Sequence, residues 1–403
     1  MGHLTVLIFR KSDNDINSMP SASVILVAGI ASIFLLLFFV FCPIKAESAD
    51  YHTIAVIDDT NRMNPSDASL THAINSVTSY RLETVEGVSV VPSFDLDMYI
   101  QESDIDSLWS MDKPTAKKFS RASNADLIII GRHILSSSGS ANIEFHIIYL
   151  ALDETIRTSK ISIKHSTSNV ESMQKDVFDK LSDKLPISHK NINWKKQNII
   201  KKKNAFNLFG EGLRNIADQR DEAGLSSFEK ALKIDPGDRD IHYYIGRYYA
   251  AKQYNYERAT YHLNEILKNN HADSRAHYWL GFTYYLKADY ASALKEFETV
   301  KSQSPYIVEN LLLLGTLYEE KGNYSAAAGS YRDALKLVPQ RASIWYSLAA
   351  ALSITGKSDE AISALKRTLE LDKKGFYDMV RTDADLAPLR KSQAYQKLIE
   401  SYK

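Results

Sequence analysis

The sequence has 403 residues but only one cysteine, Cys42, and its 49 basic and 49 acidic side chains leave no net charge. A single cysteine excludes an intramolecular disulfide framework and a cysteine-rich zinc site. The charge balance removes the strongly basic surface that typically attracts nucleic acid. We therefore expect no nucleic-acid partner.

The sequence also lacks the short motifs of common enzymes. Residues 210–212 have neither the third glycine nor the preceding strand of a dinucleotide-binding loop, and no zinc-protease motif, calcium loop or nucleophile elbow occurs. His133, His146 and His165 fall on three successive predicted strands and could meet as zinc ligands of an enzyme. Strand alternation argues against this, because His146 points away from the apolar face of its strand. We predict no catalysis, no metal and no cofactor.

One long apolar run is present near the amino terminus. Residues 16–44 contain no charged residue, and residues 24–42 are almost entirely apolar. As a helix with a rise of about 1.5 Å per residue, this run would span about 28 Å, close to the hydrocarbon thickness of a bilayer. It predicts a transmembrane signal anchor over residues 24–43, after an N-terminal segment of residues 1–23. A signal peptide cleaved near Ala46 and a lipid attached to Cys42 are the alternatives.

The carboxy-terminal half repeats one pattern five times, with a period of 34 or 35 residues. Each copy has a small residue in its first predicted helix: Gly212, Gly246, Gly281, Gly315 and Ala349. A large residue follows in the second helix, for example Phe297 or Tyr331, and a proline ends three of the copies: Pro236, Pro305 and Pro339. The small residue allows two helices to pack closely, and the proline stops the second helix. The pattern predicts stacked helical hairpins.

This pattern resembles the tetratricopeptide repeat, with five repeats over residues 205–373. The resemblance implies an all-α solenoid whose concave surface holds another polypeptide. Apolar residues at helical spacing continue over residues 374–403 and predict capping helices. A lysine-rich stretch over residues 186–204 is expected to be a solvated linker, with contact to an acidic partner or anionic lipid as the alternative.

Residues 51–185 form a separate unit without repeats. Alternating strand and helix patterns come first, followed by three strands in succession near residues 127–135, 142–151 and 158–165 and a helix over 170–185. This order predicts a small α/β domain. The segments at Ile54-Ala55-Val56 and at residues 125–131 are similar to the amino-terminal domain of TolB. The expected fold class is α+β overall, combining an N-terminal transmembrane helix, this TolB-like domain and the solenoid.

The resemblance to TolB implies a bacterial envelope protein. The expected location is the inner membrane, with a single span anchored by residues 24–42 and periplasmic carboxy-terminal domains, or the periplasm after signal cleavage. The expected function is a non-catalytic scaffold that binds proteins through the repeats and assists assembly of a membrane-associated complex. The alternative is a sensor or regulatory subunit that binds a small ligand in the α/β domain.

The tetratricopeptide resemblance also implies which residues meet a guest. In that family the second, fifth, ninth and twelfth positions of each first helix lie on the concave side, here called the inner face. An aromatic wall with guanidinium groups suits a peptide that offers apolar side chains and a carboxylate. The candidate protein-binding residues are Tyr243, Arg247, Arg275, Tyr278, Phe282, Tyr285, Leu312, Glu319 and Tyr346.

Overall fold

The computed structural model describes residues 200–403 and, of residues 52–185, all except 60–62, 64, 83–84, 86–87, 92–99, 101–107, 110, 124, 136–139 and 151–154. The described residues belong to two compact units, one ending at Pro339 and the other running from Gln340 to Lys403. The predicted segments 1–23 and 24–43 and most of the predicted linker 186–204 lie outside the described residues.

The first unit begins with a mixed five-stranded sheet in the order β2-β1-β3-β4-β5. β1 pairs parallel with β2 and β3, whereas β3, β4 and β5 form an antiparallel meander. The predicted strands are therefore present. Their bounds, with those of the helices between them, are β1 His52–Asp58, α3 Pro65–Leu82, β2 Val88–Val90, α5 Lys113–Ser123, β3 Leu127–Leu135, β4 Ser140–Leu150, β5 Ile156–Ser166 and α6 Val170–Ser182.

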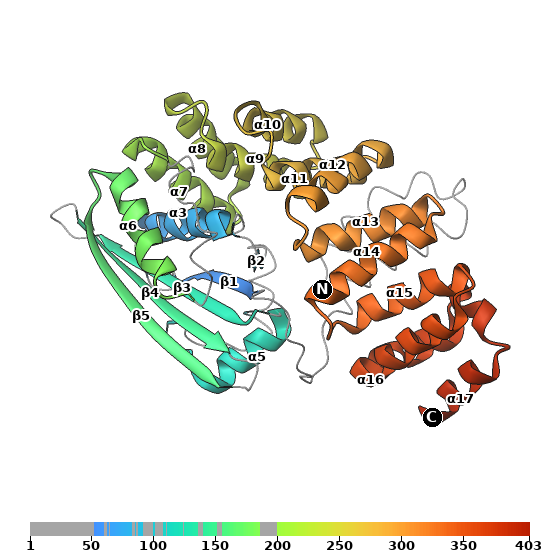
Figure 1. The fold of residues 1–403 in the computed structure, drawn as a ribbon. Coiled ribbons are helices and arrows are strands. Elements are labelled where there is room, and N and C mark those ends of the chain that lie inside the picture. The colour runs from blue at the N-terminus through green and yellow to red at the C-terminus, as the bar shows by residue number, and fades with distance from the viewer. Residues whose placement is uncertain are drawn as a thin grey trace. The chain divides into compact units, whose positions relative to one another are not determined.

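Alternation along the central strands sends apolar side chains to both faces of the sheet. Ile54 and Ile129 are buried in the core that contains α3 and α6, whereas Ile57 and Ile128 pack in a second core with Phe119 of α5. Helices therefore lie on opposite faces of the sheet (Figure 1). Burial on both faces explains why β1 and β3 appear in the sequence as continuous apolar runs.

Four helical hairpins follow in the same unit. They pair α7 with α8, α9 with α10, α11 with α12 and α13 with α14. Pro236, Pro305 and Pro339 each follow the end of a second helix, as predicted. The bounds are α7 Lys203–Ala217, α8 Asp221–Ile234, α9 Arg239–Ala251, α10 Tyr256–Asn269, α11 Ser274–Leu286, α12 Tyr290–Gln303, α13 Val308–Glu320 and α14 Tyr324–Leu337.

The repeated glycine lies directly beneath the large residue of the second helix. A Cβ atom built on Gly281 would lie 2.7 Å from the ring of Phe297, and one on Gly315 would lie 2.3 Å from the ring of Tyr331. Such distances are too short for any Cβ. The glycine thus makes room for the aromatic ring of the second helix.

The sheet and the first hairpins share one continuous core through α3 and α7. A Cβ on Gly210 would lie 2.1 Å from the carbonyl oxygen of Ser69, so only glycine permits this approach of the two helices. Arg214 Nε also donates to Ser69 Oγ at 3.1 Å. The core runs from Ile54 in β1 to Leu280 in α11. The sheet therefore packs directly against the first repeats.

The second unit contains α15 Ala342–Ile354, α16 Ser358–Thr382, the 3₁₀ helix η3 Ala384–Leu389 and α17 Gln393–Ser401. α15 and α16 form its hairpin. Lys373 stands where three of the other repeats have proline, and α16 is kinked one residue earlier, at Asp372, whose backbone is non-helical and whose side chain accepts from the backbone N–H of Gly375 at 2.8 Å. The kink therefore separates the second helix of the hairpin from the helical segment that follows it, although no proline is present there.

The predicted fold class and location need correction. Among the described residues, every helix is too short or too polar to cross a bilayer. Residues 24–42, on which the transmembrane prediction depended, lie outside the described residues. The fold class is therefore a mixed sheet with helical repeats, and the single-pass inner-membrane assignment is withdrawn. Secretion after signal cleavage stays a prediction.

Candidate functional site

The inner face of the first repeat is interior. Phe206 and Phe209, at its second and fifth positions, are 1% and 0% exposed and belong to the core shared with Ala73 of α3. One repeat further, Tyr244 Oη donates to the carbonyl oxygen of Ser76 in α3 at 3.4 Å. The first repeat therefore already holds a helix of the same chain where a guest would lie.

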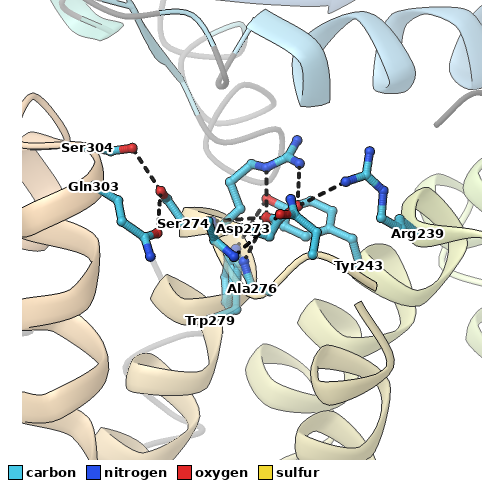
Figure 2. Close-up of polar contacts among 11 residues, drawn as sticks. Arg239, Tyr243, Asp273, Ser274, Ala276, Trp279, Gln303 and Ser304 are labelled. Carbon is cyan, nitrogen blue, oxygen red and sulfur yellow. Dashed lines mark hydrogen bonds and ion pairs between the residues drawn. The ribbon is translucent and has the colours of Figure 1, made fainter. Parts of the chain in front are cut away.

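Two predicted inner-face residues, Tyr243 and Arg275, belong to a buried polar cluster between α9 and α11. Figure 2 shows the cluster around Asp273 and Tyr243. Asp273, the N-cap of α11, accepts from Arg275 at 3.0 Å and forms a 3.7 Å ion pair with Arg239. Trp279 Nε1 donates to Tyr243 Oη at 3.3 Å. Tyr243 is 3% exposed and Arg275 6% exposed. Both therefore stabilise the stacking of two repeats.

The electrostatics of this cluster depend on its arginines. Burial alone would raise the pKa of Asp273, but the guanidinium groups of Arg275 and Arg239 outweigh it and hold that pKa below its ordinary value. At Asp240 burial prevails and raises the pKa, although the charges of Arg81 in α3, Arg275 and Arg239 each act to lower it. The cluster therefore joins the sheet domain to the second and third repeats through charge as well as apolar packing.

The remaining predicted residues of the first unit are half-buried: Arg247, Tyr278, Phe282, Tyr285, Leu312 and Glu319. The Arg247 guanidinium lies over the rings of Tyr243, Tyr244 and Trp279, with centroids 5.1–5.5 Å away. Cation–π contacts of this kind orient the guanidinium. Half-burial leaves part of each side chain for contact with another molecule.

Aromatic contacts hold this half-buried set in place. The Phe282 ring meets Trp279 edge-on at 5.3 Å, and Tyr278 lies 5.9 Å from Phe297. Tyr285 lies 5.8 Å from Tyr290, and burial raises its pKa above the usual range. Glu319 accepts a hydrogen bond from Tyr331, whose own pKa is raised chiefly by burial. The side chains are therefore ordered before any guest arrives, which lowers the entropic cost of binding.

Tyr346, the last predicted residue, lies in the second unit and is covered by its own chain. Its hydroxyl donates to Asp383, and its ring lies 5.3 Å from Phe376. Ser353, at the twelfth position of the same helix, donates to the carbonyl oxygen of Asp385 at 2.7 Å. Burial, followed by the nearby Asp383 carboxylate, raises the pKa of Tyr346. The inner face of α15 is thus filled by η3.

The three histidines weighed as zinc ligands do not converge. His133 pairs with Ile143 and His146 with Ile130, which places the two imidazoles on opposite faces of the sheet. His165 lies near Asp176 of α6, at 3.1 Å. Within the described ranges, no group of three or more potential metal-binding side chains occurs.

Sequence reasoning missed Trp279 and the Asp273 cluster. Trp279 lies at the sixth position of its helix, outside the positions that family resemblance marks for contact with a guest. A usable signal was present, because Asp238 and Asp273 recur one residue before the first helix of successive repeats, and both cap those helices. An aspartate repeated at an N-cap indicates a polar layer between neighbouring hairpins.

Stacked hairpins with a glycine beneath a large residue define a helical-repeat protein. A model of the tetratricopeptide repeat matches residues 312–375, and the chain therefore carries tetratricopeptide repeats. A curated Arabidopsis thaliana protein, described as the probable UDP-N-acetylglucosamine peptide N-acetylglucosaminyltransferase SEC, is 29% identical over 100 residues. That match covers 25% of this chain and 10% of the relative, so the chain spans about a tenth of the length of that relative.

Solved structures of repeat proteins are similar to this chain at low identity. MamA is 20% identical with a TM-score of 0.38, covering 40% of this chain and 95% of its own. YrrB, described as a TPR protein with an unusual peptide-binding site, is 19% identical with a TM-score of 0.38, covering 43% and 90%. A thermophilic TPR protein of Thermus thermophilus is 23% identical with a TM-score of 0.33, covering 45% and 98%.

Proposed function

We propose that this chain is a non-catalytic scaffold that binds a segment of another protein on the inner face of α11 and α13 and so assists assembly of a protein complex. The observation that carries the proposal is the half-buried set Arg247, Tyr278, Phe282, Tyr285, Leu312 and Glu319. Ordered aromatic and arginine side chains are the residues that most often dominate protein interfaces. The balanced charge of the chain favours a protein over a nucleic acid as the partner.

The sheet domain is proposed as a second docking surface, by its similarity to the amino-terminal domain of TolB. Its mixed sheet, with helices on both faces, supports this assignment. Because the sheet shares a core with the first repeats, a partner on either surface would meet one connected body. This arrangement suits assembly, since two partners would be held at a fixed separation.

Capture of partners tests the proposal. We expect the double variant Phe282→Ala/Leu312→Ala of the full chain to lose the proteins that wild type retains in a pull-down, because both changes remove apolar contact area. Tyr261→Ala is the matched control, since Tyr261 of α10 is 58% exposed and lies on a second helix. If the double variant and wild type retain the same proteins, the inner-face assignment is wrong.

A second candidate function, binding of a small ligand in the sheet domain, is favoured by one observation. The order β2-β1-β3 creates a topological switch point between β1 and β3, where ligands of open α/β sheets commonly bind. At that end of β1, Asp58 accepts from Asn75 at 2.7 Å and contacts His72 Nδ1 at 2.5 Å. A small-molecule thermal-shift screen checks it: a ligand whose shift disappears in His72→Gln supports binding here, and the absence of any such ligand contradicts it.

A further inference from the structure

Asp383 and η3 cover the inner face of α15. This contact indicates which kind of peptide the equivalent surface of α11 binds. η3 is capped by Asp383, whose carboxylate accepts from Tyr346. Leu386 and Leu389 follow, and both are fully buried. A 3₁₀ helix has three residues per turn, so these two leucines lie on the same side of η3. The segment therefore offers the Asp383 carboxylate to Tyr346 and presents a pair of aligned apolar side chains.

The same repeat positions on α11 carry matching groups. Tyr278 stands three residues before Gly281, as Tyr346 stands three residues before Ala349. Phe282 occupies the position of Ala350 and offers a larger apolar surface for leucine side chains. Arg247 of the neighbouring repeat adds a guanidinium, which pairs well with a carboxylate. The two inner faces thus share a tyrosine at the fifth position, and α11 has more apolar area and a nearby positive charge.

We infer that the inner face of α11 and α13 binds a short segment of a partner protein in which an acidic residue is followed, three and six residues later, by two leucine-like side chains. This inference rests on the proposed function and specifies the ligand of the same surface. The carboxylate lies toward Tyr278 and Arg247, and the two apolar side chains lie against Phe282 and Leu312.

A peptide of residues 383–390, Asp-Ala-Asp-Leu-Ala-Pro-Leu-Arg, with both ends blocked, is a direct probe. We expect the fluorescently labelled peptide to bind the full chain in an anisotropy titration. Phe282→Ala should weaken binding at least tenfold, as should replacement of both peptide leucines by alanine. Tyr261→Ala should leave the affinity unchanged. The tethered segment has an effective concentration in the millimolar range, so added peptide at micromolar concentration does not displace it from α15.

Charge recognition is tested with a double-mutant cycle. Arg247→Gln in the protein and Asp383→Asn in the peptide should each weaken binding several-fold, and the second change should add little once the first is present. If the two effects multiply fully, Arg247 does not meet the peptide carboxylate, and the inferred orientation is wrong.

Three outcomes overturn the inference. No binding at peptide concentrations up to the millimolar range would contradict it directly. Binding altered by Tyr346→Phe but unchanged by Phe282→Ala would mean exchange at α15. Partners that are captured through Phe282 and Leu312 while the peptide fails to bind would leave the proposed function standing and reject this ligand chemistry.

Discussion

The inner faces of α7 and α11 come from the same repeat pattern but have different surroundings. In α7, Phe206 and Phe209 are interior because α3 packs against that helix. In α11, the fifth position is Tyr278, the equivalent of Phe209, and it is half-buried, as is Phe282 at the ninth position. The pattern therefore determines the hairpin, whereas segments distant in the chain determine whether its inner face is covered.

One position explains much of this difference. The residue two before the repeated glycine is Gly210 in α7 and Trp279 in α11. Glycine lets the Ser69 carbonyl approach to a distance that no side chain would allow, so a helix can lie against α7. The tryptophan in α11 instead supports Arg247 and Phe282. A single substitution between repeats is thus associated with a change from a closed to an accessible surface.

The largest expected effect is the loss of stability on truncating a covered phenylalanine. Phe209→Ala should lower the free energy of unfolding by about 4 kcal/mol, because a fully buried ring is replaced by a cavity. Phe282→Ala, on the half-buried face, should cost only about 1 kcal/mol. Urea denaturation of both variants measures the difference. Equal losses would show that the two faces are buried alike.

The next prediction concerns the close approach of α3 and α7. Gly210→Ala should lower the free energy of unfolding by about 2 kcal/mol, because the clash with the Ser69 carbonyl outweighs the gain of about 1 kcal/mol in helix propensity. Gly329→Ala in α14 is the matched control, since a Cβ there meets nothing within 4 Å and should stabilise by about 1 kcal/mol. Opposite signs in chemical denaturation are expected; a gain in both variants would disprove the contact.

A smaller effect is expected from two histidines at the same repeat position. His242 and His277 each approach a backbone carbonyl through Nε2, at 2.9 Å. On the other side, His277 Nδ1 lies 2.6 Å from Glu296, whereas His242 Nδ1 lies 2.9 Å from His262. The hydrogen bond to Glu296 raises the pKa of His277. Burial lowers the pKa of His242, and burial together with His242 lowers that of His262 to about 4.

These shifts give opposite pH dependences. The stabilisation from His277 is fully present below pH 6.5, the unfolded pKa, and is lost as the pH rises through its higher folded pKa. The contribution of His262 is present above pH 6.5 and is lost as the pH falls toward 4. When the pH falls from 7 to 5.5, the free energy of unfolding of the wild type should decrease by about 1 kcal/mol through His262, and His262→Gln should not show this decrease. Over the same range it should increase by a smaller amount through His277, and His277→Gln should not show this increase. If both substitutions change the pH dependence of the denaturation midpoint in the same direction relative to wild type, the opposite pKa shifts assigned to His262 and His277 are wrong.

The sequence predicts the hairpins and the sheet because both depend on local patterns. A period of 34 or 35 residues, with proline after the second helix, locates each hairpin, and β-branched runs locate β1, β3 and β4. The transmembrane prediction depended on composition alone and is corrected. The packing of Ser69 on Gly210 and the bond from Tyr346 to Asp383 join residues far apart in the chain, which no local pattern encodes.

The inner-face residues were predicted by family resemblance, and burial separates them into two groups. Tyr243 and Arg275 are interior, because Arg275 donates to the N-cap Asp273 and Trp279 donates to Tyr243 between neighbouring repeats. Arg247 lies against aromatic rings instead and is half-buried, as are Phe282 and Leu312. Whether these three bind a guest stays a prediction.

Thiol labelling at one repeat position tests most directly whether the chain covers α15 but leaves α11 accessible. Phe282→Cys and Ala350→Cys, both at the ninth position of a first helix, are made in full chains in which the single native Cys42 is replaced by serine. We predict that the thiol at position 282 reacts with a maleimide at least about tenfold faster than the thiol at position 350, because reactivity follows exposure. Equal rates, or faster labelling at position 350, would contradict the account.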